Sequence, residues 1–169
     1  MANRATNHVL IVEKDMATAE SLMRLSEALG LPAELAQTHK NAIRACATHQ
    51  VGIIFLNPDM NMIDAKTLVE DIQSLAASRK NHPAAPILFL TESNQILQRL
   101  GLKGHPGTGV LAKPLQLEQV YVAFHKLGLI NLDPPEPAET LTGKIKVWQE
   151  FLTSAEVWTE KLREHLVPK

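Results

Sequence analysis

The stretch VGIIFLNPDMNMIDA, residues 51–65, decides the fold of this chain. Its uncharged run, residues 52–56, is too short for an amphipathic helix and is typical of a central strand covered on both faces. Asn57, Pro58 and Asp59 then end the strand. In open α/β sheets the binding site lies just beyond the carboxyl ends of the strands. We therefore expect a site at this turn, and Asn57 is its most informative residue.

Strands and helices are predicted to alternate on both sides of this stretch. Short apolar runs predict five strands, at residues 8–12, 33–36, 52–56, 87–90 and 110–112. Apolar residues at helical spacing predict five helices, at residues 17–29, 41–48, 65–78, 93–100 and 117–127. Such alternation requires parallel strands with right-handed crossovers. The predicted fold class is therefore α/β, a doubly wound five-stranded parallel sheet of flavodoxin-like order 2-1-3-4-5.

With this strand order, polar residues from four strand ends meet at one edge of the sheet. Glu13 and Lys14 follow the first strand, Asn57 follows the third, Thr91 follows the fourth and Lys113 follows the fifth. The pattern thus predicts one pocket that contains these five residues together with Asp59 of the turn after the third strand.

Composition limits the classes of function. The chain has 169 residues, 45% of them hydrophobic, which suits one domain with a core and an added segment. Its net charge of -1 gives no general attraction to nucleic acid or anionic membranes. No stretch approaches the ~20 apolar residues of a membrane span, and the N-terminus does not have the pattern of a signal peptide. We expect a cytoplasmic protein that binds neither nucleic acid nor membrane.

The sequence contains no pattern typical of a catalytic or metal site. Its seven histidines form no close pair at metal-binding spacing. There is no Gly-rich phosphate loop after the first strand and no Gly-x-Ser-x-Gly turn. The single cysteine, Cys46, rules out a disulfide framework and is interpreted as a small core residue. We therefore assign no catalytic residue, no metal and no cofactor.

Residues 8 to about 128 resemble the receiver domain of two-component response regulators. The turn at Asn57 is similar to the family's phosphoacceptor turn, because Met60 and Asp64 keep the family's spacings of three and seven residues. Glu13 resembles one member of the acidic pair that binds metal in the family.

The two remaining strand ends extend the resemblance. Thr91 matches the hydroxyl residue that follows the family's fourth strand. Lys113 and Pro114 match the Lys-Pro pair after the fifth strand, which is joined by a cis peptide bond in the family. Four features in the family's order, at four strand ends, carry the resemblance.

Several residues depart from the chemistry that the resemblance implies. The family needs a carboxylate that accepts a phosphoryl group, Mg²⁺ held by acidic neighbours, and a lysine that pairs with the phosphoryl oxygens. Asn57 occupies the acceptor position without a nucleophilic carboxylate. Lys14 puts a positive charge where the family has a metal ligand, and it could neutralise Glu13 or Asp15. Val110 stands at the position of the family's aromatic switch residue. The resemblance thus implies a degenerate pseudo-receiver that lacks the phosphoacceptor aspartate.

Other interpretations remain open. Asp59 would be an alternative acceptor, but the strand would then continue through Pro58, which cannot donate to a central ladder. A divergent receiver could still be phosphorylated on Asp59 or Asp15 in a Mg²⁺-dependent way. Alternatively, the two lysines of the pocket, Lys14 and Lys113, could hold a small anion.

The simplest interpretation is that the pocket residues stabilise the fold and bind no ligand. Lys113 could bridge Glu13 or Asn57 in a vestigial site, and Thr91 could cap the helix that follows it.

An added segment follows the receiver-like domain of residues 1–130. Residues 131–140 are predicted to form a proline-rich linker and residues 141–169 an amphipathic helix. Its seam is a set of apolar residues on alternating four- and three-residue steps: Leu141, Ile145, Trp148, Leu152, Ala155, Leu162 and Leu166.

Two further aromatic residues, Phe151 and Trp158, widen the seam on one side into a stripe that suits a helical bundle. Such a stripe must dock on something, because one helix cannot bury it alone. We expect an interaction surface of Trp148, Phe151, Leu152, Trp158 and Leu162. Homodimerisation is favoured over folding back onto the domain or capture of a partner.

The sequence as a whole therefore predicts a protein without enzymatic activity. The expected function is phosphorylation-independent signalling by contact with a signalling or regulatory protein, with the C-terminal helix as the assembly element.

Overall fold

The computed structural model describes residues 7–79 and 84–130, which contain five strands and five helices in alternation. The strands are β1 His8–Val12, β2 Ala33–Ala36, β3 Val51–Leu56, β4 Ile87–Thr91 and β5 Thr108–Ala112. The helices are α1 Met16–Ala28, α2 His39–Thr48, α3 Ala65–Ala77, α4 Asn94–Arg99 and α5 Leu117–Lys126. The predicted linker, residues 131–140, and the predicted helix, residues 141–169, lie outside the described residues.

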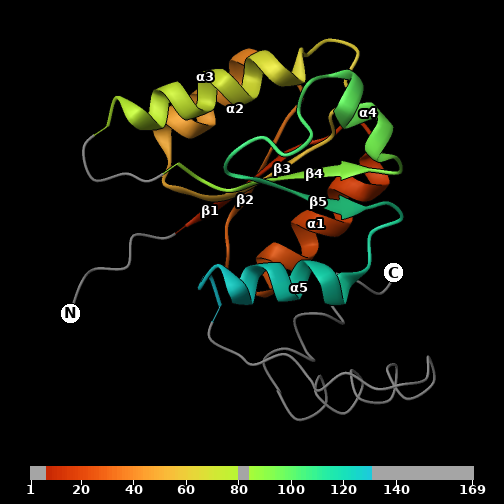
Figure 1. The fold of residues 1–169 in the computed structure, drawn as a ribbon. Helices are drawn as coiled ribbons and strands as arrows, with labels where there is room; N and C mark the ends of the chain where they lie inside the picture. The colour runs from red at the N-terminus through yellow and green to blue at the C-terminus, as the bar shows by residue number, and fades with distance from the viewer. Residues whose placement is uncertain (1–6, 80–83, 131–169) are drawn as a thin grey trace.

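All five strands form one parallel sheet in the order β2-β1-β3-β4-β5. This confirms the predicted fold class and strand order. Helices α2 and α3 cover one face of the sheet, and α1 and α5 cover the other (Figure 1).

Each face of the sheet has its own hydrophobic cluster, because side chains alternate along a strand. In β3, Ile54 and Leu56 belong to the cluster under α2 and α3, while Ile53 and Phe55 belong to the cluster under α1 and α5. All four are fully buried. A central strand that is apolar on both faces explains the uncharged run that is visible in the sequence.

Four helices begin at a side chain that accepts a backbone N–H. These caps are Asp15 for α1, Thr38 for α2, Asp64 for α3 and Ser93 for α4. Such a bond satisfies one of the unpaired donors of the first turn and fixes where the helix starts. Because Thr38 is the cap, α2 begins two residues before its predicted start.

Strand β5 also begins two residues earlier than predicted, at Thr108. Residues Thr108 and Gly109 carry no apolar signal, but the parallel ladder pairs them with Ile87 and Leu88 of β4. Tertiary pairing therefore extends the strand beyond its hydrophobic run.

Gly52 allows the chain to pack closely at the amino end of β3. A Cβ atom at this position would lie 2.8 Å from Leu129 Cδ2 and 2.9 Å from Asn7 Cβ. The missing side chain thus permits the segment after α5 to contact the sheet.

Candidate functional site

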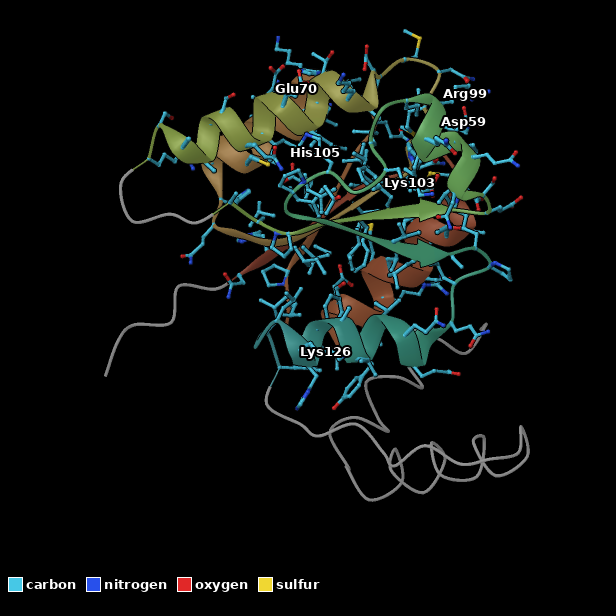
Figure 2. The ribbon with its side chains drawn as sticks, viewed as in Figure 1. Asp59, Glu70, Arg99, Lys103, His105 and Lys126 are labelled. Carbon is cyan, nitrogen blue, oxygen red and sulfur yellow. The ribbon has the colours of Figure 1, made fainter. Side chains whose placement is uncertain are left out.

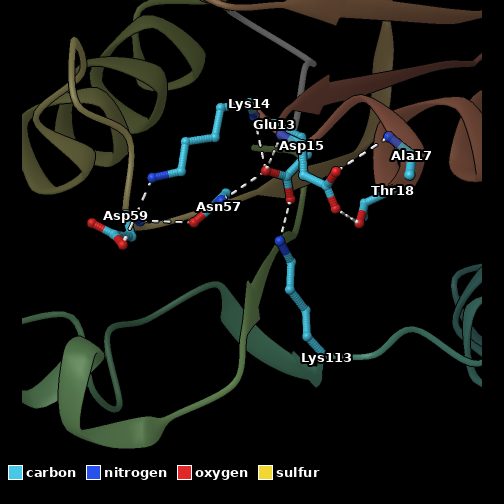
Figure 3. Close-up of polar contacts among 8 residues, drawn as sticks. All are labelled: Glu13, Lys14, Asp15, Ala17, Thr18, Asn57, Asp59 and Lys113. Atoms are coloured by element: carbon cyan, nitrogen blue, oxygen red, sulfur yellow. Dashed lines mark hydrogen bonds and ion pairs between the residues drawn. The ribbon is translucent and has the colours of Figure 1, made fainter.

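The structure brings Glu13, Asn57 and Lys113 together at the carboxyl edge of the sheet, with Lys14 and Asp59 beside them (Figure 3). Glu13 follows β1 and Asn57 follows β3, while Thr91 is the last residue of β4 and Lys113 follows β5. In the sheet, β1, β3 and β4 are the inner strands, so the residues that follow them lie near its centre.

The carboxylate of Glu13 is the centre of the pocket, and its residue is 0% exposed. Its Oε1 accepts three hydrogen bonds: from Asn57 Nδ2 at 2.7 Å, from Lys14 N at 2.8 Å and from Asp15 N at 3.0 Å. Its Oε2 lies 2.7 Å from Lys113 Nζ, on a side chain that is 16% exposed. That oxygen has no hydrogen bond of good geometry among the described residues, so the Lys113 ammonium is its electrostatic partner there.

This arrangement compensates the charge of a buried carboxylate. Burying a lone anion is very unfavourable, and a cation together with N–H donors is what makes it tolerable. Asn57 uses both ends of its amide, since Oδ1 also accepts the backbone N–H of Asp59 at 2.8 Å. The amide at position 57 thus donates to one carboxylate and orders the turn that follows.

Lys14 points away from the buried carboxylate. Its Nζ lies 3.8 Å from Asp59 Oδ2, and the two side chains are 44% and 62% exposed. The sequence suggested that Lys14 could neutralise Glu13 or Asp15; the ion pair that the structure gives it is with Asp59. An exposed pair at this distance is weak, on the order of 0–1 kcal/mol.

Asp15 is occupied at the start of α1. Its carboxylate accepts the Thr18 hydroxyl at 2.6 Å and the Ala17 backbone N–H at 3.3 Å. The hydrogen bond from Thr18 is the main cause that lowers the pKa of Asp15 below its ordinary value. The carboxylate form is therefore the one that caps the helix.

Thr91 is buried and makes a local turn at the end of β4. Its Oγ1 accepts the Ser93 backbone N–H at 3.1 Å and donates to Ser93 O at 3.0 Å. The N-cap of α4 is Ser93, whose hydroxyl accepts the Gln95 N–H. Thr91 supports the cap residue rather than serving as the cap itself.

The fifth strand end carries two further features of the pattern. The Lys113-Pro114 peptide bond is cis. Val110, on β5, is 46% exposed, which is unusual for a large apolar residue of a strand.

Other kinds of site are not found in the described part of the chain. Within residues 7–79 and 84–130, no group of three His, Cys, Asp or Glu side chains could hold a metal ion. No helix there is long and apolar enough to cross a membrane. Cys46 is free and half-buried, and it packs against the cluster under α2 and α3.

The sequence identified the residues of the pocket but missed which of them is central. Glu13 appeared as one half of a broken acidic pair, whereas in the structure four groups converge on it. The available signal was the combination of an apolar strand before Glu13 and a lysine at another strand end.

Comparisons with known proteins give structural matches. No family model matches the sequence, and no curated protein matches it. A two-component response regulator from Clostridium difficile is 26% identical, with a TM-score of 0.60, over 72% of this chain and 94% of that one.

Two other solved structures are similar at lower identity. The receiver domain of a sensor histidine kinase from Pseudomonas aeruginosa, with a magnesium ion in its active-site cleft, is 20% identical with a TM-score of 0.59, over 73% of this chain and 99% of that one. The chemotaxis response regulator CheY4 of Vibrio cholerae is 20% identical with a TM-score of 0.53, over 72% and 98%. The chain therefore has the fold of response regulator receiver domains.

Proposed function

We propose that the chain is a receiver-like module of two-component signalling that acts by binding other proteins, without phosphorylation and without enzymatic activity of its own. The observation that carries this proposal is the Glu13 network, defined as the Glu13 carboxylate with Asn57 and Lys113. The protein's own groups already satisfy the anionic centre of the pocket.

The carboxylates near the turn support the proposal, because Asp59 and Asp15 each already have another partner. Position 57 is an amide, which is not a nucleophile. Asp59 is exposed and pairs with Lys14, and Asp15 caps α1. The Lys113 ammonium, which would have to neutralise a phosphoryl group, is already paired with Glu13.

The pocket also does not suit Mg²⁺, the ion that the receiver fold implies. Magnesium binds through carboxylates and waters in near-octahedral geometry. Glu13 Oε1 accepts three hydrogen bonds, Oε2 faces the Lys113 ammonium, and Asn57 turns its Nδ2, which is a donor, toward Glu13. Entry of a cation would require loss of the Lys113 ion pair.

Binding to partners then depends on surfaces outside the pocket. The apolar stripe predicted in residues 141–169 is the strongest such feature in the sequence. We propose that its seam forms a homodimer, and that the assembled protein contacts a signalling or regulatory protein.

The test is the intact mass after incubation with acetyl phosphate and Mg²⁺. The wild-type chain should gain no phosphoryl adduct. The double variant Lys14→Asp, Asn57→Asp should gain one, because it has an acceptor and an additional acidic ligand. Lys14→Asp alone is the matched control, since it has the ligand without the acceptor, and it should remain unmodified.

An adduct on the wild-type chain would overturn the proposal. Mapping it to Asp59 or Asp15 would establish a divergent receiver instead.

A further inference from the structure

An apolar groove lies between β5 and α5, away from the Glu13 network. Its volume is about 510 Å³, and its apolar lining includes Leu88, Val110 and Leu111 from the sheet and Val122 and Ala123 from the helix. Strand β5 is at the edge of the sheet that the described residues form, so none of their other strands covers it. Val122 and Ala123 on the helix are only partly buried by the described residues.

The ends of the groove set its length. Glu118 and Lys126 both line it on α5, and Lys126 marks this helix in Figure 2. The two residues are eight positions apart on α5, which is a distance of about 12 Å along the helix axis at 1.5 Å per residue. Phe151 and Trp158 are seven residues apart, which in a helix is about 10 Å. The groove is therefore long enough for both aromatic rings.

The chain itself supplies an apolar segment that follows the groove closely in the sequence. Helix α5 ends at Lys126 and the described chain ends at Ile130, so residues 131–169 leave from the same helix that forms the groove wall. The ten residues of the predicted linker extend to about 31 Å as a proline-rich chain. Helix α5 is about 15 Å long, so the linker can place the segment alongside it.

The width of the apolar stripe supplies the second argument. A homodimer through the seam would cover one side of the predicted helix and leave Phe151 and Trp158, which we name the aromatic flank, at one edge of that contact. Two large rings exposed to water are unfavourable, so the flank needs a second apolar surface.

We infer that the groove between β5 and α5 binds the aromatic flank of the same chain's C-terminal segment. The flank docks on the domain while the seam stays available to a second copy. This inference uses the assembly helix of the proposed function but does not depend on the absence of phosphorylation. Docking would hold the helix at a fixed place on the receiver-like domain.

Tryptophan fluorescence gives a direct test, because both tryptophans of the chain lie in this segment. In the full-length variant Trp148→Phe, Trp158 of the aromatic flank is the sole tryptophan. Its quenching by acrylamide should be weak. Adding Val122→Glu or Ala123→Glu, which place a charge in the groove, should increase the quenching several-fold.

A control and a second measurement keep the outcomes distinct. Met62 is an exposed apolar residue, at 85%, that does not line the groove, so Met62→Glu should leave the quenching unchanged. Circular dichroism should show that the groove variants remain folded. The mass from light scattering should also be unchanged by the groove variants, since the seam makes the dimer.

Three results would overturn the inference. Strong quenching before any groove substitution would show a flank free for another partner. Weak quenching that the groove variants do not change would place the flank elsewhere. Quenching that rises on dilution would show docking onto a second copy. A monomeric mass with weak, groove-dependent quenching would refute the proposed homodimer and leave the docking intact.

Discussion

Replacing Lys113 by methionine should destabilise the domain strongly. The substitution keeps much of the side-chain volume and removes the ammonium that lies 2.7 Å from Glu13 Oε2. The Glu13 carboxylate, which is fully buried, would then keep its three N–H donors on Oε1 and lose its counter-charge.

The expected loss follows from this geometry. Removing one partner of a buried ion pair costs about 3–5 kcal/mol of unfolding free energy. We expect the low end, about 3 kcal/mol, because three donors remain and because Lys113 is partly exposed, so water can reach its place. For a domain of this size that corresponds to a fall in Tm of roughly 10 °C.

Urea unfolding of the full chain measures the effect, with two companion variants. Lys14→Met removes an exposed pair at 3.8 Å and should cost less than about 1 kcal/mol. Glu13→Gln combined with Lys113→Met removes both charges and should recover at least half of the loss. If Lys113→Met were as mild as Lys14→Met, the Glu13 carboxylate would not depend on Lys113, and the argument for a filled pocket would fail.

Three further predictions concern the rest of the domain. Burial raises the pKa of the Cys46 thiol from 9.0 to about 11. Near neutral pH the folded chain should therefore react with a disulfide reagent about a hundredfold more slowly than the urea-unfolded chain, and its rate should increase as pH rises. Equal rates for the folded and unfolded chains would contradict this. Gly52→Ala should cost about 1–3 kcal/mol in urea unfolding, because its Cβ would lie 2.8 Å from Leu129 Cδ2; unchanged stability would show that the segment after α5 moves aside. Asp64→Ala should lower the unfolding free energy by about 1 kcal/mol, because the cap bond from Thr67 N is lost. Asp64→Asn keeps a side-chain oxygen and should retain most of that stability. An equal loss in both variants would exclude the cap as the cause.

The sequence predicted the sheet well, because its evidence for strands and helices is local and repeated. Apolar runs on the central strands and helical spacing between them are sufficient to fix the order of elements. The ends were predicted less well. The start of α2 depends on the Thr38 hydroxyl and the start of β5 on pairing with β4, and neither leaves an apolar signal.

The pocket was predicted as a set of residues but not as a set of contacts. Strand order alone brings Glu13, Asn57 and Lys113 together. It does not say that Lys113 reaches Glu13 while Lys14 turns outward to Asp59, because flexible lysine side chains can reach several partners. The groove between β5 and α5 could not be predicted from local patterns, because its lining comes from two elements that only the folded chain brings together.

The hydrogen bond between Asn57 and Glu13 has a consequence for how this chain can evolve. A mutation that restores an aspartate at position 57 would replace a donor by an anion at 2.7 Å from a buried carboxylate oxygen. Like charges at that separation in a buried site strongly disfavour the folded state. The first step back toward an acceptor is thus disfavoured unless a change at position 13 or a bound cation precedes it. Such dependence on the order of mutations would tend to preserve the amide once it has arisen.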